Sequence, residues 1–216
     1  MKTRFIIIRH GESEGNLSNS FAGRIDVKLT PLGLKQGECT GEFLKNEKID
    51  AFYSSSLSRA YITTKLAADH HNMPVTPRDD LMEINGGKWE SLTYSSIKEQ
   101  FPENYNNWIT DIGNVHCEGG ESVKEVRDRV YSAFEEIAKM HPDQTVCVGS
   151  HGMAIRAFVL KVLGLSLDEM HSGLPWVSNA SVTYVDYEEG VFTLIEYGYD
   201  LHLEQAGIKT VLRAKA

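Results

Sequence analysis

Residues 5–11, Phe-Ile-Ile-Ile-Arg-His-Gly, most constrain the fold of this chain, because four apolar residues run directly into an arginine, a histidine and a glycine. A short apolar run rich in isoleucine is typical of a buried β-strand. Such a strand delivers Arg9 and His10 to the turn at its carboxyl end, which is the edge where open α/β sheets bind ligands. An isolated Arg-His pair, however, is more often an ordinary strand end.

The same pattern returns in residues 145–152, where a second apolar segment ends in Ser150, His151 and Gly152. Parallel strands of one sheet place their carboxyl ends at a common edge. Two neighbouring strands that each end in His-Gly can therefore bring their imidazoles together. We expect His10 and His151 to belong to one site.

Strand-like and helix-like patterns alternate along the rest of the chain. Further strands are expected at residues 49–54, 73–77, 181–187 and 191–197, the last two as a hairpin. Helices are expected at residues 31–44, 59–67, 121–140 and 153–163. This alternation predicts an α/β fold, a three-layer α/β/α sandwich around a mostly parallel central sheet.

Prolines and apolar spacing refine these elements. Thr30 and Pro31 fit the N-cap and the first position of a helix, and the two prolines of the 73–77 segment place it at a sheet edge. One helix face is predicted to hold Leu32, Gln36, Cys39, Phe43 and Leu44. The predicted core face of the 121–140 helix holds Val123, Val126, Val130, Phe134, Ile137 and Met140.

Residues 79–120 change to short helical segments separated by turn residues. Five aromatic residues lie there, Trp89, Tyr94, Phe101, Tyr105 and Trp108. We expect residues 1–216 to form a single domain in which the 79–120 segment is a helical insertion that covers the site. The aromatic residues favour a substrate whose leaving group has an apolar or ring-bearing body.

Charge limits the partners of this chain. The formal net charge is -8, and no stretch gathers lysine and arginine densely. Nucleic acid and an anionic membrane surface are therefore not expected partners. A phosphate ester would have to be attracted by a few local cations against an acidic surface.

Cysteine usage and the first residues point to a reducing cytoplasm. Cys39, Cys117 and Cys147 are widely spaced and odd in number, which gives neither a disulfide framework nor a metal-binding pattern. The chain enters its first strand at once, leaving no room for a secretory signal, and no apolar run is long enough to cross a bilayer. We expect no metal and no cofactor, and both a monomer and a homodimer stay open.

The charged residues at the strand ends suit the chemistry of a phosphoryl group, which spreads charge over three oxygens during transfer. The guanidinium groups of Arg9 and Arg59 can each bind two oxygens. A neutral nitrogen of His10 can attack phosphorus and form a phosphohistidine. His151, protonated or as a neutral donor, can hold the remaining oxygen, and the start of its helix at Gly152 adds a positive dipole.

Several motifs together resemble the histidine phosphatase (phosphoglycerate mutase-like) superfamily. They are Arg-His-Gly-Glu-Ser at residues 9–13, Ser-Ser-Ser-Leu-Ser-Arg-Ala at 54–60, Glu83 followed by Gly-Lys-Trp-Glu at 87–90, Gly-Gly-Glu-Ser at 119–122 and Ser-His-Gly at 150–152. The resemblance runs from about residue 4 to about residue 185. It is closest to the broad-specificity and alpha-ribazole phosphatase branch.

The resemblance implies a role for each matching residue. His10 would be the nucleophile, Arg9, Arg59 and His151 would form the phosphate pocket, and Asn16 would lend it an amide. Glu83 would protonate the leaving alkoxide and then deprotonate the attacking water. Gly23 and Gly152 are further candidates for phosphate binding, whereas the roles of Asn179 and of the 119–122 motif stay open.

Two positions depart from the family pattern. Ala22 stands where many relatives have a hydroxyl residue, and Ser91 stands where glycine is usual. Both are expected at the pocket rim, where they affect specificity.

The sequence predicts a metal-independent phosphomonoesterase acting on a small-molecule phosphate ester through a phosphohistidine. One alternative is a phosphoglycerate mutase, which needs a second anion site. Between residues 84 and 120 the cations are Lys88 and Lys98, among five acidic residues, so such a site is hard to build there. The other alternative, a non-catalytic phospho-ligand binding protein, would have no need of His10 or Glu83.

Overall fold

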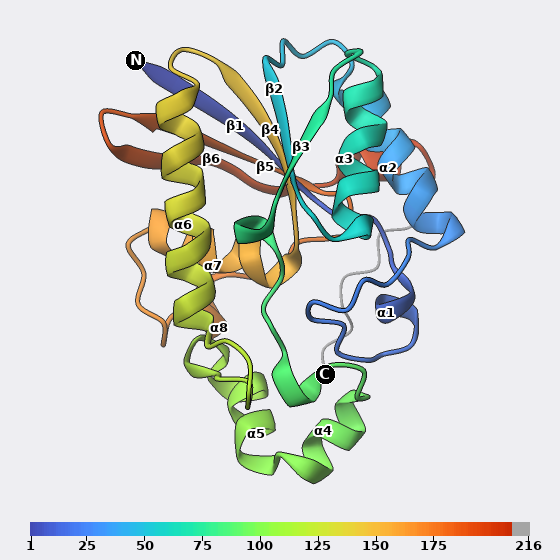
Figure 1. The fold of residues 1–216 in the computed structure, drawn as a ribbon, viewed down its shortest axis with the longest axis vertical. Coiled ribbons are helices and arrows are strands. Elements are labelled where there is room, and N and C mark those ends of the chain that lie inside the picture. Colours follow the sequence, from blue (N-terminus) through green and yellow to red (C-terminus); the bar gives the residue numbers. More distant parts are fainter. Residues whose placement is uncertain (209–216) are drawn as a thin grey trace.

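The computed structural model describes residues 1–208, which contain a six-stranded sheet with the order β3-β2-β4-β1-β5-β6 (Figure 1). Its strands are β1 (Lys2–Arg9), β2 (Ala51–Ser55), β3 (Val75–Arg78), β4 (Thr145–Ser150), β5 (Val182–Glu188) and β6 (Val191–Tyr199). The first four are parallel to one another, whereas β5 pairs antiparallel with β1 and with β6. The predicted α/β fold is confirmed, including the edge position of β3 and the β5–β6 hairpin.

Helices cover both faces of this sheet (Figure 1). Those that pack against it or lie at its ends are α1 (Glu14–Leu17), α2 (Pro31–Leu44), α3 (Ser58–Asp69), α6 (Val123–Met140), α7 (Gly152–Val162), α8 (Met170–Gly173) and α9 (Leu201–Gln205). Helices α2 and α3 lie on one face and α6 and α7 on the other. The third layer expected from the sequence is thus present.

Strand β1 supplies both halves of the core, because successive side chains of a strand point to opposite faces. Phe5 and Ile7 pack with α6 and α7, whereas Ile6 and Ile8 pack with residues of α2 and α3. All four side chains are fully buried. This double burial fixes the register of β1 and therefore the position of the two residues that follow Ile8.

Helix α2 begins as predicted but buries a different face. The Thr30 hydroxyl accepts a hydrogen bond from the Gly33 N–H, and Pro31 is the first helical residue. The buried side of α2 holds Gly33, Gln36, Gly37, Thr40, Gly41 and Leu44, and Phe43 is exposed. The expected face was therefore partly wrong, because small residues allow the helix backbones to approach closely. A Cβ atom on Gly41 would lie 2.8 Å from the carbonyl oxygen of Leu66 in α3.

One smaller expectation also fails at a helix end. Met140 is 53 % exposed, because it is the last residue of α6 and lies beyond the buried face that Ile137 still occupies. Helix α3 has Leu57 as its N-cap and no side-chain cap.

The 79–120 segment contains α4 (Tyr94–Gln100), α5 (Pro102–Thr110) and three short 3-10 turns, Asp79–Leu81, Gly87–Trp89 and Ile112–Asn114. Figure 1 shows α4 and α5 together at one end of the molecule, beyond the sheet. Phe21 packs against Trp89, Tyr94 and Trp108, with ring centroids 5.3–6.3 Å apart. The loop after β1 thus shares an apolar cluster with this segment.

The first turn of α2 packs directly on the chain that follows His10, which gives a stability prediction. A Cβ atom on Gly33 would lie 2.0 Å from the carbonyl oxygen of Glu12. We expect Gly33→Ala to destabilise the fold by about 3 kcal/mol through overpacking, more than the roughly 1 kcal/mol that alanine gains over glycine in a helix. Gly173→Ala is the control, because its nearest neighbour would be a side-chain atom at 3.4 Å. Equal denaturant midpoints for the two variants would contradict this packing.

Candidate active site

The carboxyl ends of β1 and β4 bring the two predicted histidines together. The strands are neighbours in parallel register, with Arg9 opposite Ser150, so His10 and His151 follow at the same edge. Their ring centroids are 5.1 Å apart. The expectation that the two imidazoles meet is confirmed by this geometry.

The protonation of His10 is set by the backbone beside it. Its Nδ1 atom lies 2.7 Å from the carbonyl oxygen of Gly11. Because a carbonyl only accepts hydrogen bonds, Nδ1 must carry the proton in this contact. In the neutral ring the lone pair is then on Nε2. The Gly11 N–H donates to the Thr63 hydroxyl at 3.0 Å, which ties this turn to α3.

His151 is fully buried, and its environment favours the neutral imidazole. Burial, followed by the nearby charges of Arg59, His10 and Arg9, holds the pKa of His151 well below its usual range. Ser55 Oγ lies 2.7 Å from His151 Nε2 and accepts from the Leu57 N–H at 3.3 Å. A hydroxyl that donates to Nε2 places the imidazole proton on Nδ1.

That Nδ1 atom has no hydrogen-bond partner among residues 1–208. Buried polar atoms are nearly always paired. A neutral His151 therefore presents a buried donor that an added acceptor, such as a phosphoryl oxygen, can satisfy.

Two buried arginines supply the positive charge. Arg9 donates through Nη1 to the Val177 carbonyl oxygen, and its Nε is buried without a partner in the described chain. Burial lowers the pKa of Arg9 to about 10, with Glu83 opposing the shift and Arg59 adding to it, so it stays charged at neutral pH. Burial also lowers the pKa of Arg59, and Glu83 again opposes the shift.

Arg59 also shapes the loop after β1. It donates to the carbonyl oxygens of Gly23 and Ile25, both at 2.8 Å. Gly23 has φ +51°, a left-handed conformation that favours glycine. The predicted binding residue Gly23 is thus held against the predicted phosphate ligand Arg59.

Two asparagines complete the edge of the site. Asn179 donates through Nδ2 to the His10 carbonyl oxygen at 3.0 Å and to Asn16 Oδ1 at 3.3 Å. Asn16 Oδ1 also accepts from the Ser13 N–H at 3.0 Å. These bonds fix the orientation of the Asn16 side-chain amide, because its Oδ1 atom is the acceptor in both. Its Nδ2 group is the donor of that amide, and Asn16 lines the pocket.

Glu83 lies against the start of α7. Its carboxylate accepts from the N–H groups of Ile84 at 2.9 Å, Met153 at 3.1 Å and Ala154 at 3.2 Å. A helix N-terminus favours a negative group, and here the Glu83 carboxylate binds the backbone N–H groups of the first turn of α7. Gly152 lets Trp176 and Arg9 come close to the start of α7, because a Cβ atom there would lie 3.2 Å from the Trp176 ring and 3.4 Å from Arg9 Nε.

These groups surround one pocket of about 480 Å³, counted with the solvent space at its mouth. It is lined by Arg9, His10, Ser13, Gly15, Asn16, Ser20, Phe21, Ala22, Gly23, Arg59, Glu83, Ile84, Trp108, Gly152, Met153 and Trp176. Every predicted site residue except His151 belongs to this lining, and His151 lies beside it with no exposed surface.

The aromatic residues of the 79–120 segment differ in their relation to the pocket. Of the five aromatic residues in the 79–120 segment, Trp108 lines the pocket, whereas Trp89 is fully buried in the core. Ala22 lies on the pocket wall as expected, but Ser91 does not. Ser91 has φ +69°, which explains why glycine suits that position.

Sequence reasoning missed Ser55 and Trp176. Ser55 ends β2 beside β4, and the rule that site residues follow parallel strands would have found it. Trp176 lies in a loop after α8 and has no local signal. It reaches the wall because Arg156 is stacked 4.7 Å from the centre of its ring.

A pocket that brings together two guanidinium groups, an imidazole and a carboxylate at one edge of an α/β sheet suits phosphoryl transfer. The comparisons agree with this class. The model of the histidine phosphatase superfamily (branch 1) matches residues 5–200. The chain therefore belongs to the histidine phosphatase superfamily, and its activity is that of a phosphatase.

Two curated relatives show the same family. Phosphoserine phosphatase 1 of Hydrogenobacter thermophilus is 33% identical over 200 residues, which cover 93% of this chain and 94% of the relative. The metal-independent phosphoserine phosphatase of Arabidopsis thaliana is 31% identical over 208 residues, which cover 95% of this chain and 85% of the relative.

Solved structures share the fold. YhfR of Bacillus stearothermophilus has a TM-score of 0.89 and 25% identity, covering 93% of this chain and 99% of that chain. A mutant phosphoserine phosphatase of Entamoeba histolytica in complex with phosphoserine has a TM-score of 0.82 and 26% identity, with coverage of 93% and 99%. The alpha-ribazole phosphatase of Shigella flexneri has a TM-score of 0.80, and its 23% identity over 90% of this chain and 96% of that chain shows the fold alone.

Within residues 1–208, no three His, Cys, Asp or Glu side chains are placed to hold a metal ion. The same part of the chain contains no helix that is long and apolar enough to cross a membrane.

The depressed pKa of His151 gives a prediction about stability and pH. As the pH falls through about 6.5 the unfolded chain protonates this histidine while the folded chain does not, so the free energy of unfolding decreases. Full uptake of one proton lowers the free energy of unfolding by about 1.4 kcal/mol per pH unit below that pH. We expect His151→Asn to lack this decrease. Urea unfolding at pH 7.5, 6.0 and 5.0 measures the difference, and parallel pH dependences of the two proteins would contradict a neutral His151.

Proposed function

We propose that this chain hydrolyses small-molecule phosphate monoesters through a covalent phosphohistidine at His10, without a metal ion. The observation that carries the proposal is the convergence of His10, with its lone pair on Nε2, on a pocket shared with Arg9, Arg59 and Glu83. The relative described as metal-independent supports the same chemistry.

The first step transfers the phosphoryl group to the enzyme. His10 Nε2 forms a bond to phosphorus while the bond from phosphorus to the ester oxygen breaks. The electron pair goes to the leaving oxygen, which takes a proton from the acid form of Glu83. The Gly11 carbonyl accepts from Nδ1–H and stabilises the positive charge that the ring then carries.

The second step releases phosphate. Glu83, now a carboxylate, takes a proton from a water molecule whose oxygen attacks phosphorus. The bond from phosphorus to His10 Nε2 breaks, and its electron pair returns to the ring. Both steps pass through a phosphoryl group whose negative oxygens are bound by Arg9, Arg59, the Nδ1–H of His151 and the amide of Asn16.

The mutase alternative has little support in the pocket. The cationic residues of the pocket lining are Arg9 and Arg59, both of which serve the transferred group. Lys88 forms an ion pair with Glu118 outside the lining, so no second strong anion site is formed there by the described residues.

The wall beyond the phosphate end is uncharged. It includes Phe21, Ala22, Ile84, Met153 and Trp176. Because two relatives are phosphoserine phosphatases by name, phosphoserine is the first substrate to test beside uncharged esters. We also propose a reducing location such as the cytoplasm, which three free cysteines support.

The direct test is release of inorganic phosphate from a panel of esters with chelator present. Native protein is expected to hydrolyse them, and His10→Ala to lose at least about a thousandfold in kcat/KM because the nucleophile is absent. The panel includes 3-phosphoglycerate with and without 2,3-bisphosphoglycerate. Isomerisation with little phosphate release would indicate the mutase, and ligand binding without turnover would indicate the binding protein.

A further inference from the structure

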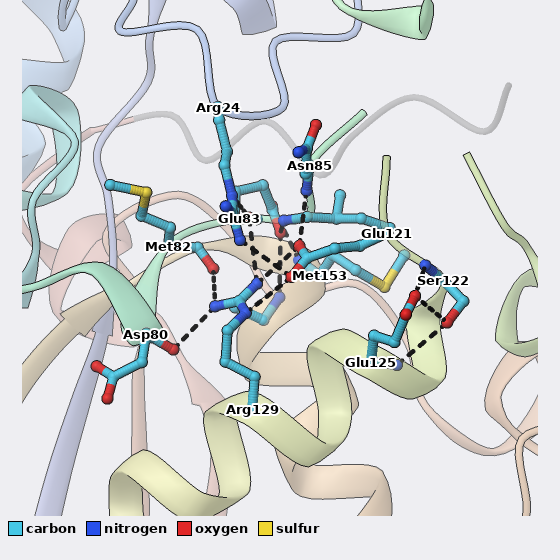
Figure 2. Close-up of polar contacts among 12 residues, drawn as sticks. Arg24, Asp80, Met82, Glu83, Asn85, Glu121, Ser122, Glu125, Arg129 and Met153 are labelled. Atoms are coloured by element: carbon cyan, nitrogen blue, oxygen red, sulfur yellow. Dashed lines mark hydrogen bonds and ion pairs between the residues drawn. The ribbon is translucent and has the colours of Figure 1, made fainter. Parts of the chain in front are cut away.

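Glu121 and two arginines hold the backbone that carries Glu83, outside the pocket itself (Figure 2). Glu121 accepts a two-point contact from Arg129, with Nε and Nη2 each 3.0 Å from a carboxylate oxygen. Arg24 Nη2 donates to the same carboxylate at 3.0 Å. The Asn85 N–H also donates to it, at 2.9 Å. We call Arg24, Glu121 and Arg129 the clamp.

The two arginines of the clamp satisfy the carbonyl groups around Glu83. Arg129 Nη1 donates to the carbonyl oxygens of Asp80 at 2.8 Å and Met82 at 3.0 Å. The carbonyl oxygen of Glu83 itself accepts from Arg24 Nε at 3.3 Å and Arg129 Nη2 at 3.4 Å. Residues 82–86 lie between two 3-10 turns and belong to no helix or strand, so the clamp replaces the hydrogen bonds of regular structure.

The clamp also reaches the phosphate side of the site. Arg24 lies between Gly23 and Ile25, whose carbonyl oxygens both accept from Arg59. Arg24 therefore connects the loop held by a phosphate-binding arginine to the segment that carries the acid. The base of the clamp is rigid, because Glu121 precedes Ser122, which caps α6 in a reciprocal pair with Glu125 (Figure 2).

We propose that Glu121 is a positioning residue that sets the Glu83 carboxyl group relative to the phosphoryl group held by Arg59. The proposal rests on the acid role of Glu83 in the proposed function. Its physical basis is charge: the side chains of Glu121 and Arg129 are 18% and 19% exposed, and partly buried, two-point contacts between arginine and carboxylate are strong and directional. A glutamine at 121 keeps the shape but turns an NH2 group toward an arginine, which releases the clamp.

The test separates positioning of the acid from general structural damage. Aryl phosphates whose phenols differ in acidity depend to different extents on protonation of the leaving oxygen. We expect Glu121→Gln to lower kcat/KM for phenyl phosphate at least tenfold more than for 4-nitrophenyl phosphate, whose leaving group hardly needs the acid. In a Glu83→Gln background, Glu121→Gln should add no further difference between the two esters.

Asp186→Asn is the matched control, because Asp186 pairs with Lys2 and Arg4 near the opposite end of β1. It removes a carboxylate from two cations without touching the site, and it should leave the ratio of the two rates unchanged. Should Glu121→Gln fail to fold, Arg24→Gln opens the same clamp from its other end and carries the same expected ratio.

Equal losses for both esters in Glu121→Gln, or a changed ratio in Asp186→Asn, would overturn the proposal while leaving the proposed function intact. A Glu83→Gln variant that treats both esters alike would overturn the acid role itself, and the positioning role with it.

Discussion

Desolvation of cationic side chains at the strand ends is the constraint on which the site depends. Arg9, Arg59, His10 and His151 meet at one edge of the sheet, and desolvation disfavours every charge there. His151 is accordingly neutral, and the charge of Glu83 opposes the lowering of the pKa of both arginines by burial. A phosphoryl group can supply the remaining negative charge and an acceptor for the two buried nitrogens, Arg9 Nε and His151 Nδ1, that lack a partner within residues 1–208. Affinity for an anion thus follows from how the pocket is built.

The scaffold holds this arrangement from two directions. Strand β1 is buried on both faces and fixes His10, whose carbonyl and ring nitrogen are bound by Asn179 and Gly11. Glu83 lies on irregular backbone, and its place depends on charged side chains from elsewhere in the chain. His10 is therefore positioned by the sheet, and Glu83 by ion pairs that link the loop after β1 to the start of α6.

The parts of the fold that a sequence predicts are those set by local patterns. Three such features depend on a few adjacent residues, and all are present: the strand before His10, the similar strand before His151 and the helix start at Thr30 and Pro31. The buried face of α2 could not be predicted from hydrophobicity, because glycines gain their packing from the partner helix α3. Trp176 and the role of Glu121 depend on contacts between residues far apart in the chain, with Arg156 and Arg129 respectively. Residue type alone does not show which aromatic residues of the 79–120 segment reach the pocket, and Trp89 packs with Phe21 in the core.

The measurement that tests the central claim most directly is to quench the enzyme in alkali during turnover of a labelled phosphate ester and to map the labelled peptide. Phosphohistidine formed at His10 would appear as phosphate that survives alkali, is lost in acid and lies on the peptide containing residue 10. Label on another side chain, or a peptide containing His10 that stays unmodified throughout turnover, would contradict the account.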